Sequence, residues 1–549
     1  MRLNILSAGL HCTLMLLVLT TSACRNPPPK TAASAHGNTD WHIDTANEFL
    51  FGVDNSGNPS ADNHAPDSWD REHLHVGKTN TGQFYFDSAK ASPGDDLDAD
   101  SGIDKDVMLF FYAGHGSATS WNTLGDSGTQ SKMRLGNNEG SGRLRYYWQC
   151  SCDVFAHGPQ SGSCGTSDFD YACPGEFDGS DDSFSMRNVY QRWGPALGDD
   201  LRMACGVSTL AYCHESQTNK IWDDYNNKGY DVSDSFIDGL DTGTTVPLCI
   251  TKGGWNATQT PLFDHEFTNQ YNASGTSYYY IQYLGPPFLL PKIEVPLERL
   301  PEFLPIWELK PLTLPETFAD LQFETSGGVQ QATLSERGER PVRRQVRILP
   351  ASGAVYVRAE LKADIGTPTL TDAAYVDRAR AIMVQLGLDE PAAIASKGGR
   401  FMIARVPVSS VKPLTRQPDV QKNVTVTFQR QVAVHELRIP VLGEGGQIAV
   451  QLNNDGTLRN LAKVWRQVVG VKREARVKRP EEARAEAMRQ LATPEKYKVH
   501  RLTWGYQERA GNVVQNELRF VYRFELVPVE PRDAQEFPPR IVEVPGQED

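Results

Sequence analysis

A histidine and a cysteine follow two strand-like segments in an arrangement that suits nucleophilic catalysis. His115 stands between Gly114 and Gly116, directly after an apolar run, and Cys152 comes 37 residues later, just after a second strand-like run. Peptide hydrolysis by cysteine needs a thiolate, a base for its proton, and amide donors for the oxyanion. Such groups collect at the carboxyl ends of parallel strands. The order and placement therefore predict that Cys152 and His115 meet at one edge of a sheet.

Strands and helices must alternate to bring these two residues together. Residues 107–112, 144–149 and 246–251 are strand-like apolar runs, and residues 185–201 and 220–240 have helical patterns. Alternation of this kind is typical of a mostly parallel sheet. We expect an α/β fold with a mostly parallel sheet flanked by helices, followed by a separate α+β C-terminal domain.

The second half of the chain has different patterns and no cysteine. Residues 355–361, 400–406 and 446–452 are strand-like, and the Asp455-Gly456 dipeptide after the last of them predicts a hairpin. Residues 480–491 form an amphipathic helical pattern that begins with proline.

Eight prolines between Pro286 and Pro315 mark the main boundary. Because proline lacks a backbone donor, we expect this segment to stay outside sheets and helices and to pack its apolar residues on a domain surface. The predicted organisation is a signal peptide, a tether, a catalytic domain, a Pro-rich linker and an α+β domain, at residues 1–24, 25–40, 41–284, 285–318 and 319–549.

The N-terminus carries a targeting signal. A positive start and a short apolar run are followed by Thr20-Thr21-Ser22-Ala23-Cys24, which resembles the lipobox of bacterial lipoproteins, with Thr21 in place of the usual leucine. The resemblance implies cleavage before Cys24, lipid attachment to its sulfur, and a membrane-anchored location in the bacterial cell envelope. An ordinary signal peptide that is cut near Ala23 is the alternative.

Two motifs resemble a known group of peptidases. FYAGHG at Phe111–Gly116 and YWQCSCDVFAHGP at Tyr147–Pro159 resemble the clan of caspases, metacaspases, legumains and gingipains (clan CD), and are most similar to an uncharacterised bacterial domain-of-unknown-function family. The likeness covers residues 41–284. It implies a caspase-like fold and a Cys/His dyad.

The resemblance also implies a role for each residue near the dyad. Cys152 matches the nucleophile, His115 the general base, and the amides of Gly116 and Cys152 the oxyanion donors. Ser151 matches the small residue before the nucleophile, and Cys150 lies near the site. His157 is an alternative base. Asp153 departs from metacaspases, which have histidine there, and its charge disfavours a neighbouring thiolate.

Composition limits the partners. The net charge of −13 argues against nucleic acid, which requires clustered basic residues. The acidic first half and the basic stretch of residues 459–501 are compatible with contact within the chain, although a solvated surface is the commoner explanation. The expected partners are a protein or peptide substrate and, through the lipid anchor, a membrane.

Other features of the sequence favour disulfides over metals. Apart from Cys12 and Cys24, seven cysteines lie within residues 150–249, and disulfides are plausible for them in an oxidising compartment. No cofactor is expected. The loop of residues Asp95–Asp106 is rich in aspartate, but it lacks the glycine and glutamate of an EF-hand, so calcium there is a weaker hypothesis.

Three functions follow from these residues. The first is a secreted, lipid-anchored cysteine endopeptidase of the caspase-like clan with an acyl-enzyme mechanism. The second is a catalytically inactive caspase-like binding module at the cell surface, with disulfide-paired cysteines. The third is a surface processing factor whose C-terminal part recognises a partner; that part weakly resembles PepSY and related propeptide modules.

Overall fold

The computed structural model describes most of the chain after residue 200 and separate pieces before it. The described ranges are 39–45, 48–55, 83–87, 109–114, 120–124, 130–134, 145–150, 155, 193, 197, 201–208, 217, 220–221, 223–241, 246–254, 260–265, 277–285, 287–288, 290, 297–326, 329–336, 342–359, 370–408, 419–491, 493–511, 513–529 and 540–548.

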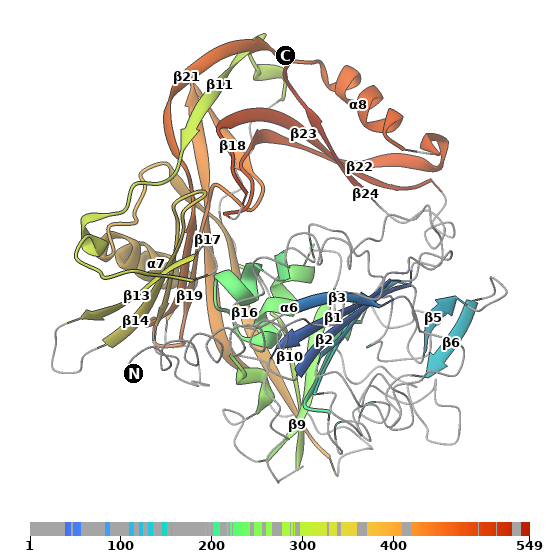
Figure 1. The fold of residues 1–549 in the computed structure, drawn as a ribbon. Helices are drawn as coiled ribbons and strands as arrows, with labels where there is room; N and C mark the ends of the chain where they lie inside the picture. The colour runs from blue at the N-terminus through green and yellow to red at the C-terminus, as the bar shows by residue number, and fades with distance from the viewer. Residues whose placement is uncertain are drawn as a thin grey trace, which may run out of the picture.

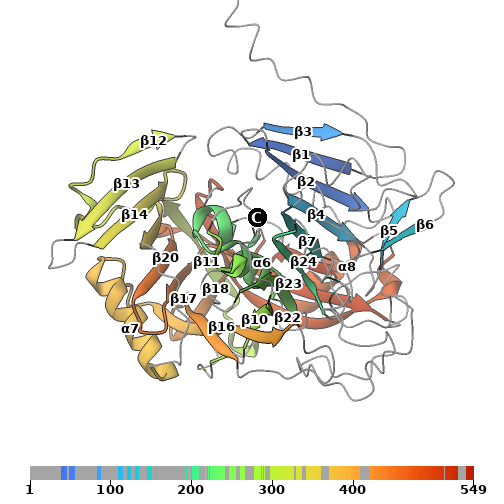
Figure 2. The same cartoon turned by 90° about the horizontal axis from the view of Figure 1, so that it is seen from below.

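Hydrogen bonds link 22 of the described strands (Figures 1 and 2). One end of this sheet holds strands that pair in parallel, in the order β2, β4, β7, β8. Two strands, β1 and β3, extend it with antiparallel pairing. A hairpin, β5–β6, lies outside the sheet. The bounds are β1 Thr39–Thr45, β2 Glu48–Asn55, β3 Gln83–Asp87, β4 Leu109–Gly114, β5 Ser120–Leu124, β6 Gln130–Arg134, β7 Tyr146–Cys150 and β8 Met203–Val207.

From β8 onward the sheet is antiparallel. Its order continues β9, β10, β16, β17, β19, β20, β15, β14, β13, β12, so that strands from both halves of the chain form one surface. Figure 2 shows β3, β1 and β2 at one end and β12–β14 at the other. The bounds are β9 Pro247–Gly253, β10 Tyr278–Leu284, β12 Glu324–Ser326, β13 Val329–Glu336, β14 Val342–Leu349, β15 Ala354–Ala359, β16 Ala393–Pro407, β17 Val420–Val434, β19 Gln447–Leu452 and β20 Leu458–Val464.

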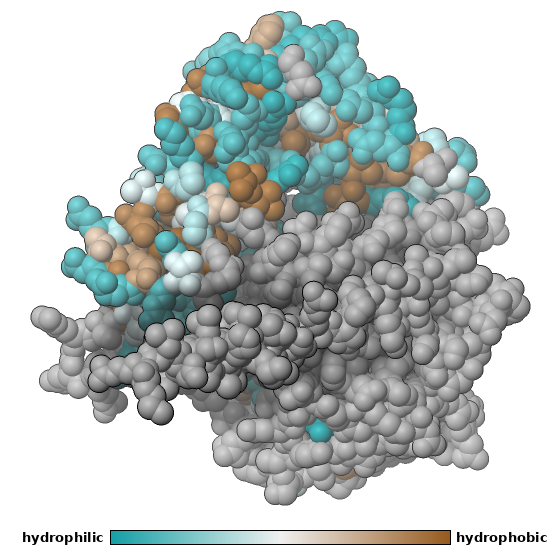
Figure 3. Space-filling model, in the orientation of Figure 1, coloured by the Kyte–Doolittle hydropathy of each residue, from teal (hydrophilic) through white to brown (hydrophobic). Residues whose placement is uncertain are grey.

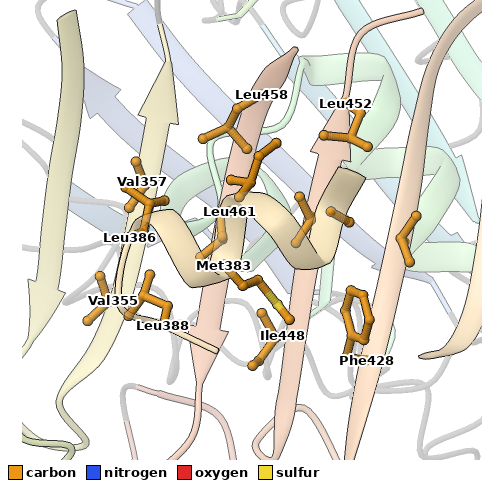
Figure 4. Packing of buried hydrophobic residues seen from close by; sticks show 14 of the residues in the cluster. Val355, Val357, Met383, Leu386, Leu388, Phe428, Ile448, Leu452, Leu458 and Leu461 are labelled. Carbon is orange, nitrogen blue, oxygen red and sulfur yellow. The ribbon is translucent and has the colours of Figure 1, made fainter. Parts of the chain in front are cut away.

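Two helices cover different parts of this sheet. Helix α6 (Val232–Leu240) follows the π-helical turn η3 (Asp223–Asn227), and its Phe236 packs on Trp148 of β7 with 5.5 Å between ring centroids. Helix α7 (Asp372–Gln385) begins at Thr371, whose hydroxyl accepts a hydrogen bond from the Ala374 amide, as an N-cap does. Figure 4 shows Met383 of α7 above the valine, leucine and isoleucine side chains of β15, β19 and β20.

A further group of strands, here called the second layer, continues from β17, which pairs with β18. Strand β18 pairs in parallel with β22, which continues through β23 to β24, while β11 joins β21 to β23. Helix α8 (Pro480–Arg489) covers β23 and β24 (Figure 1). The surface of this layer is mainly hydrophilic, with smaller hydrophobic areas (Figure 3). The strand bounds are β11 Phe303–Lys310, β18 Leu437–Leu442, β21 Gln467–Arg476, β22 Tyr497–Gln507, β23 Glu517–Pro528 and β24 Arg540–Pro545. Three short 3-10 turns are η5 Pro261–Phe263, η6 Leu297–Arg299 and η7 Glu316–Phe318, and a fourth, η8, spans Pro494–Lys496.

The predicted fold class is wrong. The described residues form mainly strands in one large mixed sheet that is mostly antiparallel, rather than a helix-flanked, mostly parallel caspase-like sheet. Residues 246–251, expected to be parallel, form β9, which is antiparallel to both of its neighbours. A continuous apolar run reports burial on both faces of a sheet; it does not report strand direction. The C-terminal part is also not a separate sheet, because β10 pairs with β16.

The Pro-rich segment differs from expectation in two respects, because it contains the 3-10 turn η6 (Leu297–Arg299) as well as a strand. Phe303–Lys310 forms β11 and pairs with β21, although Pro305 lies within it. The register of this pairing shifts between Ile306 and Trp307 and again between Glu308 and Leu309, as at a β-bulge. Phe288 packs as expected, on the surface of β16, where its ring lies so close to Gly398 that a Cβ there would approach within 2.1 Å. The domain bounds themselves stay a prediction.

Candidate functional site

The strands that precede His115 and Cys152 are neighbours. β4 and β7 pair in parallel, with Ala113 opposite Cys150. His115 follows the last residue of β4, Gly114, and Cys152 comes two residues after Cys150. Parallel strands in this register end at the same edge of a sheet. The last described residues before His115 and Cys152 therefore lie at one edge of the sheet.

The residues expected to carry out the chemistry lie just beyond these ends. His115, Gly116, Ser151 and Cys152 are outside the described residues. Of the predicted site, the structure describes the backbone of Gly114 and Cys150, at the ends of β4 and β7. The lipidation residue Cys24 and the Asp95–Asp106 loop also lie outside the described residues.

Phe155, three residues after Cys152, lies against the end of β8. The amide of Phe155 donates a hydrogen bond of 3.0 Å to the carbonyl oxygen of Val207, the last residue of β8. The Phe155 ring is fully buried and stacks on Trp193, with 5.1 Å between centroids. Cys152 thus belongs to a four-residue connection, 151–154, between two described anchors at the carboxyl ends of β7 and β8.

Strand β7, which precedes this connection, is packed on both of its faces. Tyr147 packs on Trp193 with 5.0 Å between ring centroids, and its hydroxyl donates a hydrogen bond to Oε1 of Gln149 in the core. Trp148 points to the opposite face and packs on Phe236. Packing on both faces holds the strand that leads into Cys150.

One disulfide lies beside these strands. Cys205 of β8 and Cys249 of β9 are directly opposite each other and are bonded, with their Cα atoms 4.0 Å apart. Both residues are fully buried. Two of the seven cysteines within residues 150–249 are therefore not candidates for a reactive thiol. The state of Cys152 stays a prediction.

A buried cluster of charged residues was not expected from the sequence. Lys422 of β17 lies 2.7 Å from a carboxylate oxygen of Asp231 and 2.7 Å from one of Asp234. Arg459 of β20 lies 2.9 Å from Asp231, and all four side chains are fully buried. The imidazole of His265 also contacts Asp231.

The electrostatics of this cluster keep Asp231 ionised. Burial alone would raise its pKa, but the charges of Lys422 and Arg459 and the hydrogen bond to His265 outweigh burial, so that the pKa of Asp231 lies well below its usual range. Asp234 accepts hydrogen bonds from three side-chain amides. The partners of these aspartates are up to 228 residues away, and no local pattern could have indicated them.

The cluster is better suited to holding the fold together than to catalysis. The charges of Lys422, Arg459, Asp231 and Asp234 are fully buried and paired with one another, as charges removed from water must be. Within the described part of the chain, no group of three or more histidine, cysteine, aspartate or glutamate residues is arranged to hold a metal ion. Nor does any helix described there have the length and apolar run needed to cross a membrane.

Comparisons with known proteins add little. No protein-family model matches the chain, and no curated protein does. An uncharacterised protein from Eubacterium rectale is 9% identical, with a TM-score of 0.25 over 44% of this chain and 83% of its own. The C-terminal domain of YpeB from Bacillus megaterium is 11% identical, with a TM-score of 0.18 over 40% of this chain and 86% of its own. Similarity this low does not establish a shared fold.

Proposed function

We propose that this chain is a cysteine hydrolase of peptide bonds, with Cys152 as the nucleophile and His115 as the general base. The observation that supports the proposal is the parallel pairing of β4 and β7 with Ala113 opposite Cys150. It brings the described strand ends that precede His115 and Cys152 to one sheet edge. The Phe155 amide, bonded to Val207 at that edge, limits how far Cys152 can be from it.

The proposed reaction has two stages. The Cys152 thiolate attacks the carbonyl carbon of the substrate and forms a carbon–sulfur bond, while the amides of Gly116 and Cys152 stabilise the oxyanion. The carbon–nitrogen bond then breaks as protonated His115 gives its proton to the leaving amine. In the second stage His115 takes a proton from water and the resulting hydroxide attacks the carbonyl carbon of the thioester. The carbon–sulfur bond breaks, which releases the acid and restores the Cys152 thiolate beside protonated His115.

We also propose that the protein works at a membrane surface in the bacterial cell envelope. The lipobox-like segment ending at Cys24 supports this part of the proposal. The substrate would then be a protein or peptide outside the cytoplasm.

The direct test is cleavage of a complex peptide mixture by the full purified chain. New peptide termini, identified by mass spectrometry, should appear with wild type and with Cys150→Ser. They should be lost with Cys152→Ala and with His115→Ala, because removing the nucleophile should cost at least the roughly 10²–10³-fold that loss of one oxyanion donor costs. If wild type produces no new termini, or Cys152→Ala produces the same ones, the chain is not this hydrolase and the inactive binding module takes its place.

A further inference from the structure

The two halves of the chain share one sheet. β10, the last strand before the Pro-rich segment, pairs with β16 over seven residues, from Tyr278 opposite Pro407 to Leu284 opposite Phe401. On its other side β10 pairs with β9. The boundary between the halves therefore has continuous backbone hydrogen bonding across it.

Lysine and arginine side chains of the second half form ion pairs across this boundary with aspartates of the first half. Lys422 and Arg459 of the second half reach Asp231, and Lys422 also reaches Asp234. Near the surface, Lys397 of β16 lies 2.7 Å from Asp241, at the end of α6. In each pair the first half supplies the carboxylate and the second half the cation.

Neutral donors from the second half complete the coordination of Asp234. The side-chain amides of Asn423 and Gln451 donate to one of its oxygens at 2.7 and 2.9 Å. Lys422 also donates to the side chain of Gln282 in β10 at 3.1 Å. The second half thus presents a set of donors to the acidic end of α6 and to β10.

We infer that the second half is the binding partner that the first half needs in order to fold, and that the halves remain bound to each other when the connection between them is cut. The binding surface consists of β16, β17 and β20; its ligand is β10 with α6. A buried carboxylate that loses its cation is strongly destabilising, so matching charges select this one partner. The inference does not rest on the proposed hydrolase activity.

The experiment uses the full chain with a protease site inserted between Pro291 and Pro296, cleaved after purification. The two fragments should elute together on gel filtration and stay together in about 1 M salt, because buried ion pairs are screened little. Urea should separate them only as ellipticity is lost, in a single transition. If the fragments separate in native buffer and each keeps a cooperative unfolding transition, the inference is wrong.

A pair of lysine variants tests the role of charge. Lys422→Met should weaken association of the cleaved fragments by about 100-fold or more, the cost of leaving buried carboxylates without their cation. Lys472→Met is the matched control, because Lys472 is 53% exposed and its partner Glu517 lies in the same half; it should not change association. If the cleaved fragments of Lys422→Met associate as tightly as those of wild type and of Lys472→Met, the role given to Lys422 is wrong. If Lys422→Met does not fold, the urea transition of the cleaved wild-type protein still decides the inference.

Discussion

The amide of Phe155 is hydrogen-bonded to the carbonyl of Val207, which fixes the chain at the end of β8 three residues after Cys152. Stacking of Phe155 on Trp193 adds a buried side-chain contact to this backbone bond. Together they anchor the chain at Phe155, three residues after Cys152.

Loosening this anchor should lower activity. Phe155→Ala removes a fully buried ring and should cost about 3–5 kcal/mol of stability, with turnover down by about 100-fold through misplacement of Cys152. Turnover should be measured where urea melts show that the variant is folded. Phe303→Ala is the control, because Phe303 is 49% exposed. Full turnover of folded Phe155→Ala would show that the anchor does not position the nucleophile.

The Cys205–Cys249 disulfide should stabilise the first half of the chain. The bond spans 44 residues, for which the chain-entropy relation gives about 4 kcal/mol. A reductant should therefore lower the midpoint of wild-type thermal unfolding and leave that of the Cys205→Ala/Cys249→Ala protein unchanged. If the reductant lowers both midpoints equally, another disulfide is responsible.

Asp224 should make stability depend on pH in a defined window. Burial raises its pKa from 3.8 to about 6, despite the nearby charges of Lys220 and Lys228. An acid with a higher pKa in the folded protein takes up a proton on folding, so its contribution to the free energy of unfolding falls as pH rises from about 4 to about 6. The free energy of unfolding of wild type minus that of Asp224→Asn should fall by up to about 3 kcal/mol as pH rises over this window. Urea melts at several pH values measure it, and a difference that stays constant would contradict the raised pKa.

The lipid anchor can be tested separately. Wild type should incorporate labelled palmitate and partition into detergent, and Cys24→Ala should do neither. Cys12→Ala provides a matched control that should behave like wild type. A wild-type protein that is secreted without lipid would favour the ordinary signal peptide cut near Ala23.

The sequence predicted single elements better than their arrangement. Residues 144–149 and 480–491 correspond to β7 and α8, and the Asp455-Gly456 turn joins β19 to β20, with Gly456 in the left-handed region at φ 79°. These features depend on neighbouring residues, which a sequence pattern records directly.

Features set by distant residues were missed. β8 was not recognised, because its five residues, MACGV, include alanine and glycine, which favour strands weakly. The buried pairing of Lys422 with Asp234 joins positions 188 residues apart. A solvated surface is the commoner explanation for a basic stretch such as residues 459–501, but Arg459, the first residue of that stretch, is buried and paired with Asp231.

The reactivity of Cys152 in the native protein tests the proposed function most directly. The protein should be treated with iodoacetamide under native, non-reducing conditions, and the labelled cysteines identified by mass spectrometry. Cys152 should react fastest among the cysteines, and His115→Ala should slow its alkylation by about tenfold or more, because the thiolate loses its base. Recovery of Cys152 in a disulfide-linked peptide, or alkylation unaffected by His115→Ala, would contradict the hydrolase.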